Sequence, residues 1–202
     1  MTDSPLLNLA RVLDCTRAEG PGRRLCVWVQ GCLQKCPGCC NSDMQPLVSR
    51  ELVPPSVLDE RLARAQSVYG IEGVTFLGGE PLLQSRGLAE VARFAQSRGL
   101  SVMVFTGYTL AECSSFPYVA DLLAATDVVV DGPFRADMPD RCRNWVGSAN
   151  QRFHYLTSRY DASIETDEEF RNVVELREDE GRLFMNGCPS IISKCTATLS
   201  HA

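Results

Sequence analysis

The stretch Leu25-Cys-Val-Trp-Val-Gln-Gly-Cys-Leu-Gln-Lys-Cys-Pro-Gly-Cys-Cys-Asn41 joins an apolar run to a loop that is crowded with cysteine. Its first six residues, five of them apolar and the last Gln30, form a short run bounded by turn residues, which predicts a buried β-strand. Cys32, Cys36 and Cys39 then fall within eight residues of one another. We therefore expect a strand whose carboxyl end opens into a cysteine-bearing loop.

The spacing of these three cysteines favours an iron–sulfur cluster. A cubane cluster with cysteine on every iron passes electrons only, whereas three cysteines leave one iron open to a substrate. Ten cysteines in 202 residues are fewer than the roughly 8–10% of a short secreted disulfide scaffold. In a reducing compartment, a tight cysteine group more often binds metal or does redox chemistry. The other seven lie far apart and are expected to be small buried apolar side chains: Cys15, Cys26, Cys40, Cys113, Cys142, Cys188 and Cys195.

Composition excludes several classes of function. The net charge of −5 and the pI near 5.1 argue against a nucleic-acid-binding surface, which would show clustered Lys and Arg. No apolar run approaches the ~20 residues that span a bilayer, and residues 1–9 lack the features of a signal peptide. We expect a soluble, cytoplasmic protein with no membrane or nucleic-acid partner.

Strand-like and helix-like segments alternate along the first two thirds of the chain. Such alternation, with strands that are apolar on both faces, predicts an α/β fold with a mostly parallel sheet joined by right-handed crossovers. The expected strands are Leu25–Gln30, Gly73–Leu77, Ser101–Thr106 and Asp127–Asp131. One helix is expected to begin at Ser56, and two more are expected over Gln84–Arg98 and Tyr118–Ala125.

The last part of the chain has a different pattern. Val173–Arg177 and Arg182–Met185 flank a polar turn that ends in Gly181, which predicts a β-hairpin. Residues 157–169 are acidic and polar, as expected of a surface connection. We expect a core domain over residues 1–155 and a C-terminal extension over residues 156–202 that packs on it.

Each expected strand ends in an unusual loop. After the cysteine loop come Gly78-Gly-Glu-Pro81, Thr106-Gly-Tyr108 and Asp131-Gly-Pro-Phe134. Ligands of parallel α/β folds bind at the carboxyl ends of the strands, so four such loops on one rim predict an active site. A Gly-Gly pair alone is a common turn, but it lets backbone approach a ligand without a Cβ in the way.

These motifs, in this order, resemble the radical S-adenosylmethionine superfamily. More narrowly, Glu19-Gly-Pro-Gly22, the cysteine loop with Asn41, Thr106-Gly-Tyr108, Val130-Asp-Gly-Pro-Phe134 and Asn150-Gln-Arg152 are similar to the activating enzymes of anaerobic ribonucleotide reductase. The resemblance covers roughly residues 18–155. It implies a partial, incomplete β/α barrel whose open side admits a loop of a partner protein.

The resemblance also implies cofactors and roles. Its cofactors would be a [4Fe-4S] cluster, held by Cys32, Cys36 and Cys39, and S-adenosylmethionine, which is cleaved to a 5′-deoxyadenosyl radical. By the same resemblance, Gly78, Gly79 and Glu80 would meet the methionine amino group. Thr106 and Asp131 would contact ribose, carboxylate or a cation, and Asn150 and Arg152 would line the same opening. For Asp131, a strand-ending turn residue is an equally good interpretation.

The partners implied by this resemblance are a glycyl-radical enzyme similar to anaerobic ribonucleotide reductase, an electron donor such as flavodoxin or ferredoxin, and a second copy in a homodimer. One departure is Cys40, where these activases commonly have His. Another is the length of chain after residue 155, which includes Cys188 and Cys195. These two thiols alone are too few for a second cluster.

Three other interpretations stay open on the sequence alone. The first is a radical S-adenosylmethionine enzyme that modifies a peptide or small molecule. The second is a structural zinc site that uses Cys40 or a distant residue as fourth ligand, although zinc sites usually show two paired arms. The third is an electron-transfer protein with a fully ligated cluster.

Overall fold

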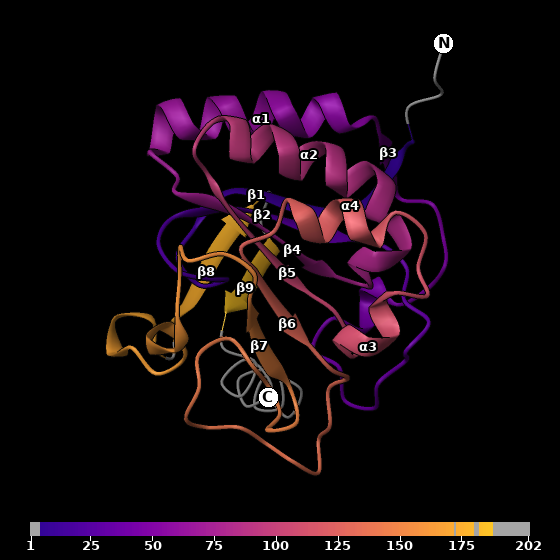
Figure 1. Ribbon diagram of the computed structural model, residues 1–202, viewed down its shortest axis with the longest axis vertical. Helices are drawn as coiled ribbons and strands as arrows, with labels where there is room; N and C mark the ends of the chain where they lie inside the picture. Colours follow the sequence, from indigo (N-terminus) through magenta and orange to yellow (C-terminus); the bar gives the residue numbers. More distant parts are fainter. Residues whose placement is uncertain (1–4, 172, 180–181, 188–202) are drawn as a thin grey trace.

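A mixed seven-stranded sheet, in the order β3-β1-β2-β4-β5-β6-β7, organises the protein. The computed structural model describes residues 5–171, 173–179 and 182–187. Helices cover one face of the sheet, and the hairpin formed by β8 and β9 lies on the other side (Figure 1). The strands are β1 (Leu7–Thr16), β2 (Arg24–Val29), β3 (Glu51–Val53), β4 (Gly73–Gly78), β5 (Ser101–Phe105), β6 (Val128–Asp131), β7 (Arg152–Tyr155), β8 (Val174–Asp179) and β9 (Arg182–Gly187).

The four central strands are parallel, as predicted. Strand β2 pairs with β4, β4 with β5, and β5 with β6, with Val27 opposite Phe76 and Phe76 opposite Val104. The connections contain α1 (Pro55–Tyr69), α2 (Ser85–Ser97), α3 (Leu110–Cys113) and α4 (Val119–Ala124), together with the short 3-10 helices η1 (Ser42–Met44) and η2 (Pro81–Gln84). The predicted α/β class is confirmed, and the partial barrel stays a prediction.

Three strands were not expected from the sequence. Strand β1 pairs antiparallel with β2 and with β3, and β7 pairs antiparallel with β6. In β1, Leu7 and Leu9 are buried while Asn8 and Ala10 are only half-buried, which is the alternation of a strand whose two faces differ in burial. These strands extend the parallel centre on both sides.

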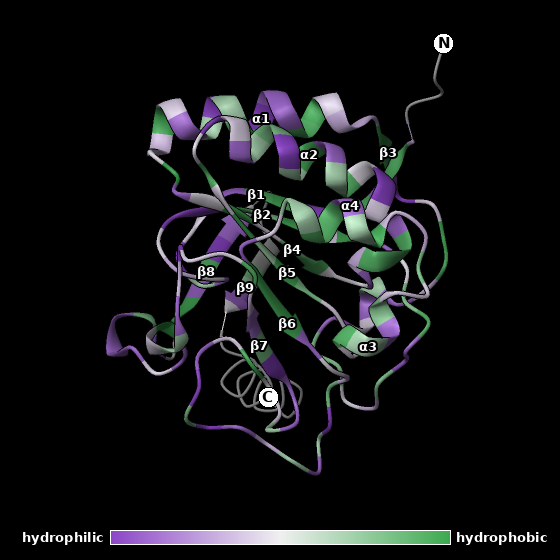
Figure 2. Cartoon of the chain, viewed as in Figure 1, coloured by the Kyte–Doolittle hydropathy of each residue, from purple (hydrophilic) through white to green (hydrophobic). Residues whose placement is uncertain are grey.

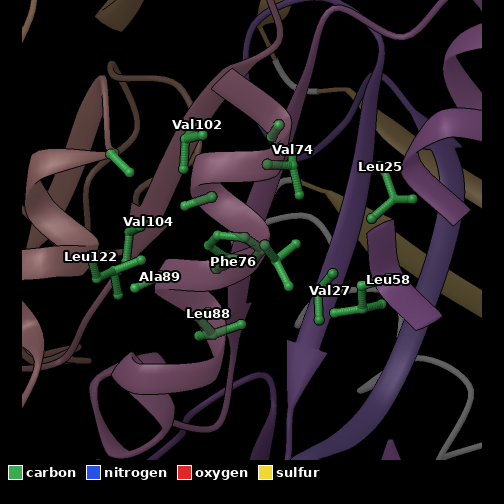
Figure 3. Packing of buried hydrophobic residues seen from close by; sticks show 14 of the residues in the cluster. Leu25, Val27, Leu58, Val74, Phe76, Leu88, Ala89, Val102, Val104 and Leu122 are labelled. Carbon is green, nitrogen blue, oxygen red and sulfur yellow. The ribbon is translucent and has the colours of Figure 1, made fainter. Parts of the chain in front are cut away.

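The main core lies between the sheet and the helices. Leu58 of α1 and Leu88 of α2 are fully buried near strand residues such as Val27 and Phe76 (Figure 3). Leu62 of α1 is fully buried in the same cluster. Figure 2 shows apolar and polar residues interleaved along both helices, so each turns one apolar side to the sheet. Burial of each large side chain contributes about 1.5–3 kcal/mol, so this layer holds the strands in register.

The opposite face of the sheet has smaller apolar clusters. One contains Cys26, Trp28, Met44 and Leu77, and another contains Met103, Val128, Val130, Val146 and Ile164. Side chains of a strand alternate between its faces, so Trp28 points away from the helices while Val27 points toward them. Loops and the hairpin cover this face instead of helices (Figure 1).

The predicted C-terminal hairpin is confirmed. Arg17 donates its backbone N–H to Glu175 Oε1 at 2.8 Å, and Asn186 Nδ2 donates to Thr16 Oγ1 at 3.0 Å. The hairpin therefore packs on the end of β1. The division of the chain into domains near residue 155 stays a prediction.

The acidic connection between β7 and the hairpin contains two short 3-10 helices, η3 (Ala162–Glu165) and η4 (Glu168–Phe170). Most of its side chains are exposed, as expected, but Ile164 is buried in the cluster on the open face. Cys188 and Cys195 lie outside the described residues. Among the described helices, none combines the length and apolar character needed to cross a membrane.

Candidate functional site

A cavity of about 710 Å³ lies on the face of the sheet that the helices leave free. Cys32, Cys36 and Cys39 line it from the loop after β2, and Gly78–Glu80 line it from the loop after β4. Thr106 lines it from the end of β5. The structure thus brings together seven of the ten predicted site residues in one cavity, within the volume range of ligand-binding pockets.

Backbone hydrogen bonds hold the cysteine loop in place. The N–H of Gly31 donates to Met44 O at 2.8 Å, and the N–H of Cys32 donates to Gln45 O at 2.9 Å. Within the loop, Lys35 and Gly38 adopt left-handed conformations, with φ of 48° and 75°. Such residues turn successive N–H groups toward one side of a loop, which is how backbone nests bind anions.

Each of the three thiols receives backbone N–H groups. Burial raises the pKa of Cys32, opposed by the N–H groups of Gln34 and Lys35. Burial likewise raises the pKa of Cys36, opposed by the N–H of Phe134 from the loop after β6. Hydrogen bonds of this kind to cysteine sulfur tune iron–sulfur clusters. The donor set and its surroundings therefore fit a thiolate-bound cluster.

Cys39 and Cys40 interact directly. The hydrogen bond from the Cys40 side chain lowers the pKa of Cys39 to about 6, and the same contact raises the pKa of Cys40 well above its ordinary value. Cys40 also lines the cavity. The neighbouring thiol thus favours Cys39 as the thiolate of the pair.

The cysteines do not converge on a single point. Among the residues that the structure describes, no three His, Cys, Asp or Glu side chains are arranged to hold one metal ion. A tetrahedral zinc site needs such convergence, whereas each cysteine of a cubane cluster binds a different iron.

The glycine pair lies directly against the cysteine loop. Gly79 donates its N–H to Val29 O at 2.8 Å, and Glu80 donates its N–H to Gly31 O at 2.8 Å. A Cβ on Gly79 would lie 2.3 Å from Gly31 O and 2.9 Å from Met44 O. Gly78 has a φ of 108°, which other residues rarely adopt. Both glycines are therefore required by the close approach of two loops.

The Glu80 carboxylate links the loop after β4 to the loop after β5 from a fully buried position. Its Oε1 accepts from Thr106 Oγ1 at 2.8 Å and from Leu82 N at 3.0 Å, and its Oε2 accepts from Gly107 N at 2.9 Å. Burial raises the pKa of Glu80, opposed by these hydrogen bonds. In this structure, the carboxylate fixes the positions of Thr106 and Gly107.

The three remaining predicted residues do not line the cavity. Asp131 accepts from Leu110 N at 2.6 Å, and its Oδ2 lies 2.9 Å from His154 Nε2, at ion-pair distance but without hydrogen-bond alignment. Asn150 donates from Nδ2 to Pro133 O at 2.7 Å, and Arg152 is exposed at the start of β7. Their roles as cofactor ligands stay predictions.

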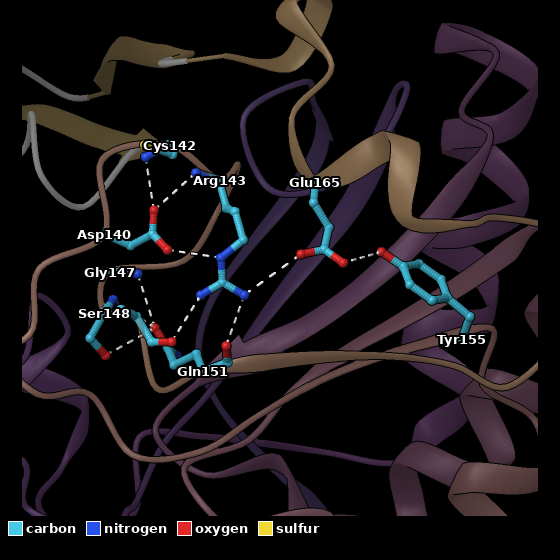
Figure 4. A network of polar contacts seen from close by, with 9 residues as sticks. Asp140, Cys142, Arg143, Gly147, Ser148, Gln151, Tyr155 and Glu165 are labelled. Carbon is cyan, nitrogen blue, oxygen red and sulfur yellow. Dashed lines mark hydrogen bonds and ion pairs between the residues drawn. The ribbon is translucent and has the colours of Figure 1, made fainter.

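A loop between β6 and β7 forms another part of the cavity wall. Arg143 donates from Nε to Asp140 Oδ2 at 2.8 Å and from Nη1 to Gln151 O at 2.9 Å, and Tyr155 donates to Glu165 Oε1 at 2.9 Å (Figure 4). This network holds the loop that carries Phe134 and Trp145 of the cavity wall. Gln151, rather than its neighbours Asn150 and Arg152, lines the cavity.

Sequence reasoning missed the far end of the cavity, where Arg11 and Glu19 meet the hairpin. Thr75 Oγ1 donates to Glu19 O at 2.8 Å and accepts from the buried Arg24 Nε at 2.7 Å. Burial raises the pKa of Glu19 to about 8, opposed by hydrogen bonds from the Asn186 side chain and the Gly187 N–H. The only sequence signal for this part of the cavity was the Glu19-Gly-Pro-Gly22 motif, to which no site role was assigned.

Comparison with known proteins places the chain among iron–sulfur activating proteins. The family described as "4Fe-4S single cluster domain" matches residues 18–154. The anaerobic ribonucleoside-triphosphate reductase-activating protein of Salmonella typhimurium is 35% identical over 144 residues, which cover 68% of this chain and 92% of that protein. The corresponding protein of Escherichia coli K12 is 31% identical, with coverage of 68% and 92%. That of Pasteurella multocida is 33% identical, with coverage of 75% and 99%.

We predict that Gly79→Ala displaces the cysteine loop. The added Cβ collides with backbone oxygen atoms that cannot rotate away, so the free energy of unfolding should fall by about 1–3 kcal/mol. Iron bound after anaerobic reconstitution should fall as well. Gly99→Ala is the control, because a Cβ there meets nothing within 4 Å and adds only strain at a φ of 75°. Equal iron content in both variants would contradict the close approach.

We predict that Glu19→Gln changes how stability depends on pH. Because the folded protein keeps a proton on Glu19 that the unfolded chain releases above about pH 4.5, this group makes unfolding easier as the pH rises from 4.5 to about 8. The glutamine variant lacks this contribution. Its melting temperature, relative to that of the native protein in reducing buffer, should therefore rise between pH 5 and pH 8.

Glu112→Gln is the matched control for this pH series. Hydrogen bonds from Thr109 lower the pKa of Glu112, so its contribution is lost only at more acidic pH and its effect should be constant between pH 5 and pH 8. A constant difference for Glu19→Gln over the same range would show that Glu19 is ionised in the folded protein.

Proposed function

This chain belongs to the family of anaerobic ribonucleoside-triphosphate reductase-activating proteins and contains a 4Fe-4S single cluster domain, and we propose that it is a radical S-adenosylmethionine enzyme. In this proposal it cleaves S-adenosylmethionine reductively and generates a glycyl radical on an anaerobic ribonucleoside-triphosphate reductase. The activity named for the relatives supports the partner, and the site supports the chemistry.

One observation carries the proposal. The cysteine loop and the Gly78-Gly79-Glu80 segment are hydrogen bonded to each other and line the same cavity. A protein that only transfers electrons needs no ligand cavity beside its cluster, whereas a cluster with an open iron does. The cavity therefore supports a substrate-binding cluster over the electron-transfer interpretation.

The residues that would hold the cofactors follow from their positions. Cys32, Cys36 and Cys39 would bind three irons of the cluster. When bound and reduced, the cluster and S-adenosylmethionine supply a 5′-deoxyadenosyl radical, which is chemistry that belongs to the cofactors. The protein supplies ligation, orientation and exclusion of water.

The glycine pair would orient S-adenosylmethionine through its backbone. Without Cβ atoms, Gly78 and Gly79 can present carbonyl groups to the methionine amino group. Glu80 keeps this segment fixed relative to Thr106, because its carboxylate binds Thr106 Oγ1 and Gly107 N. A segment that is already fixed loses less conformational entropy when the cofactor binds.

For the remaining predicted residues, we propose positioning roles. Asp131 binds the N–H of Leu110, and Asn150 binds Pro133 in the loop that brings Phe134 to the Cys36 thiol. Loss of either would move a rim loop. Arg152 is exposed beside this rim, where it is available to a partner.

The proposal also requires an electron donor, such as flavodoxin or ferredoxin, to reduce the cluster. A homodimer is expected only from the resemblance to the family. A radical S-adenosylmethionine enzyme that acts on another peptide or a small molecule is the alternative, and the reductase test separates the two.

We predict that Cys36→Ala abolishes cofactor cleavage. After anaerobic reconstitution, the native protein should bind about four irons per chain, and reduction with S-adenosylmethionine should yield 5′-deoxyadenosine and methionine. Cys36→Ala should lose both the iron and the products, measured by iron analysis and mass spectrometry.

Alanine variants of two further cysteines serve as a control and as a test of the ligand set. Cys142 is exposed and does not line the cavity, so Cys142→Ala should match the native protein. Cys40→Ala tests whether the neighbouring thiol is a ligand, and it should retain the iron because Cys32, Cys36 and Cys39 already supply the three thiolates of the proposed cluster. A reducible, fully loaded native protein that yields no 5′-deoxyadenosine would overturn the proposal.

A further inference from the structure

The C-terminal hairpin forms part of the cavity wall. Met185, Asn186 and Gly187 of β9 line the same cavity as the three cysteines. They stand at the end where Arg11 and Glu19 also line it. The hairpin therefore belongs to the site as well as to the scaffold.

The hairpin is fixed in this position by several contacts. Asn186 binds Thr16 Oγ1, Glu175 accepts from the N–H of Arg17, and the Arg11 guanidinium stacks over the Phe184 ring at 4.6 Å. At Gly187, with a φ of 117°, a Cβ would lie 2.2 Å from Val173 O. Side chains on such a wall are held in place before a ligand arrives, which reduces the entropy cost of binding.

This wall is an addition to the shared domain. The family match ends at residue 154, and the hairpin begins at Val174. The matches cover 92% of the length of the Salmonella typhimurium and Escherichia coli proteins but only 68% of this chain. A ligand that contacts the hairpin is therefore recognised by residues beyond the family match, which ends at residue 154.

This end of the cavity combines apolar surface with a buried polar pair. Glu19 and Asn186 are only 8% and 5% exposed, and Trp28 and Leu77 provide apolar surface beside them. The Asn186 side chain and the Gly187 N–H bind Glu19, and Asn186 Nδ2 also donates to Thr16 Oγ1, so the polar pair holds β9 in place. Met185 adds to the apolar surface of the cavity, which suits an uncharged peptide segment.

We propose that Met185 of the hairpin, on a wall that Asn186 and Glu19 hold in place, contacts the polypeptide segment of the partner that carries the acceptor glycine. This inference rests on the proposed function, because it names where the partner's segment lies in that same site. It makes the hairpin a determinant of which partner this chain accepts.

Photo-crosslinking tests this contact directly. With p-benzoylphenylalanine at position 185, irradiation of the reconstituted protein mixed with the organism's anaerobic ribonucleoside-triphosphate reductase should give a cross-link, which mass spectrometry should map to the segment with the acceptor glycine. The matched control is position 68, because Val68 lies on α1 at the opposite face of the sheet, is 63% exposed and does not line the cavity. It should give no cross-link to that segment. Absence of the cross-link from position 185, or an equal yield from both positions, overturns the inference.

A binding measurement provides the second test. Met185→Trp enlarges a side chain on the cavity wall and should weaken association with the reductase by about tenfold, measured by calorimetry on the protein without its cluster and again after reconstitution. Val68→Trp, on the exposed side of α1, should bind as the native protein does. Equal affinity of both variants overturns the inference.

The two proposals fail in different ways. If the native protein yields 5′-deoxyadenosine and activates the reductase but position 185 gives no cross-link, the inference about the hairpin fails and the proposed function stands. If the native protein yields no 5′-deoxyadenosine, the proposed function fails by that measurement, which does not involve the hairpin.

Discussion

The close approach of two backbone segments determines the site. Gly79 and Glu80 donate their N–H groups to Val29 and Gly31, so the loop after β4 lies directly against the cysteine loop. This contact requires that position 79 has no Cβ. It also brings the Glu80 carboxylate to Thr106 and Gly107, so three strand ends share one buried anchor. Removal of this contact would separate the thiols from the segment proposed to orient the second cofactor.

The sheet makes this arrangement possible because its two faces are covered differently. Helices bury one face in a continuous core, which stabilises the strands. The other face is covered by loops and the hairpin, and a cavity remains between them and side chains such as Trp28 and Leu77. Stability and ligand binding are thus assigned to opposite faces of the same strands.

Much of this architecture could be predicted from the sequence because its signals are local. The apolar runs of β2, β4, β5 and β6 and the spacing of three cysteines are readable within short windows. Strands β1 and β7 were missed, since their pairing depends on neighbours far along the chain. The meeting of Glu19 with Asn186 could not be predicted either, because it depends on how the hairpin packs against β1. Asp131 and Asn150 show a further limit, since motif position alone does not say whether a side chain points into the cavity.

We propose that this chain generates a radical on a glycine of its partner by removal of a hydrogen atom. The most direct test is electron paramagnetic resonance of the anaerobic ribonucleoside-triphosphate reductase after incubation with the reconstituted protein, S-adenosylmethionine and a reductant. We predict a doublet signal, split by the remaining α-hydrogen of the glycine. The doublet should collapse to a single line when the reductase is prepared with glycine deuterated at the α-carbon. A reductase that stays silent beside a protein that actively cleaves S-adenosylmethionine would contradict it.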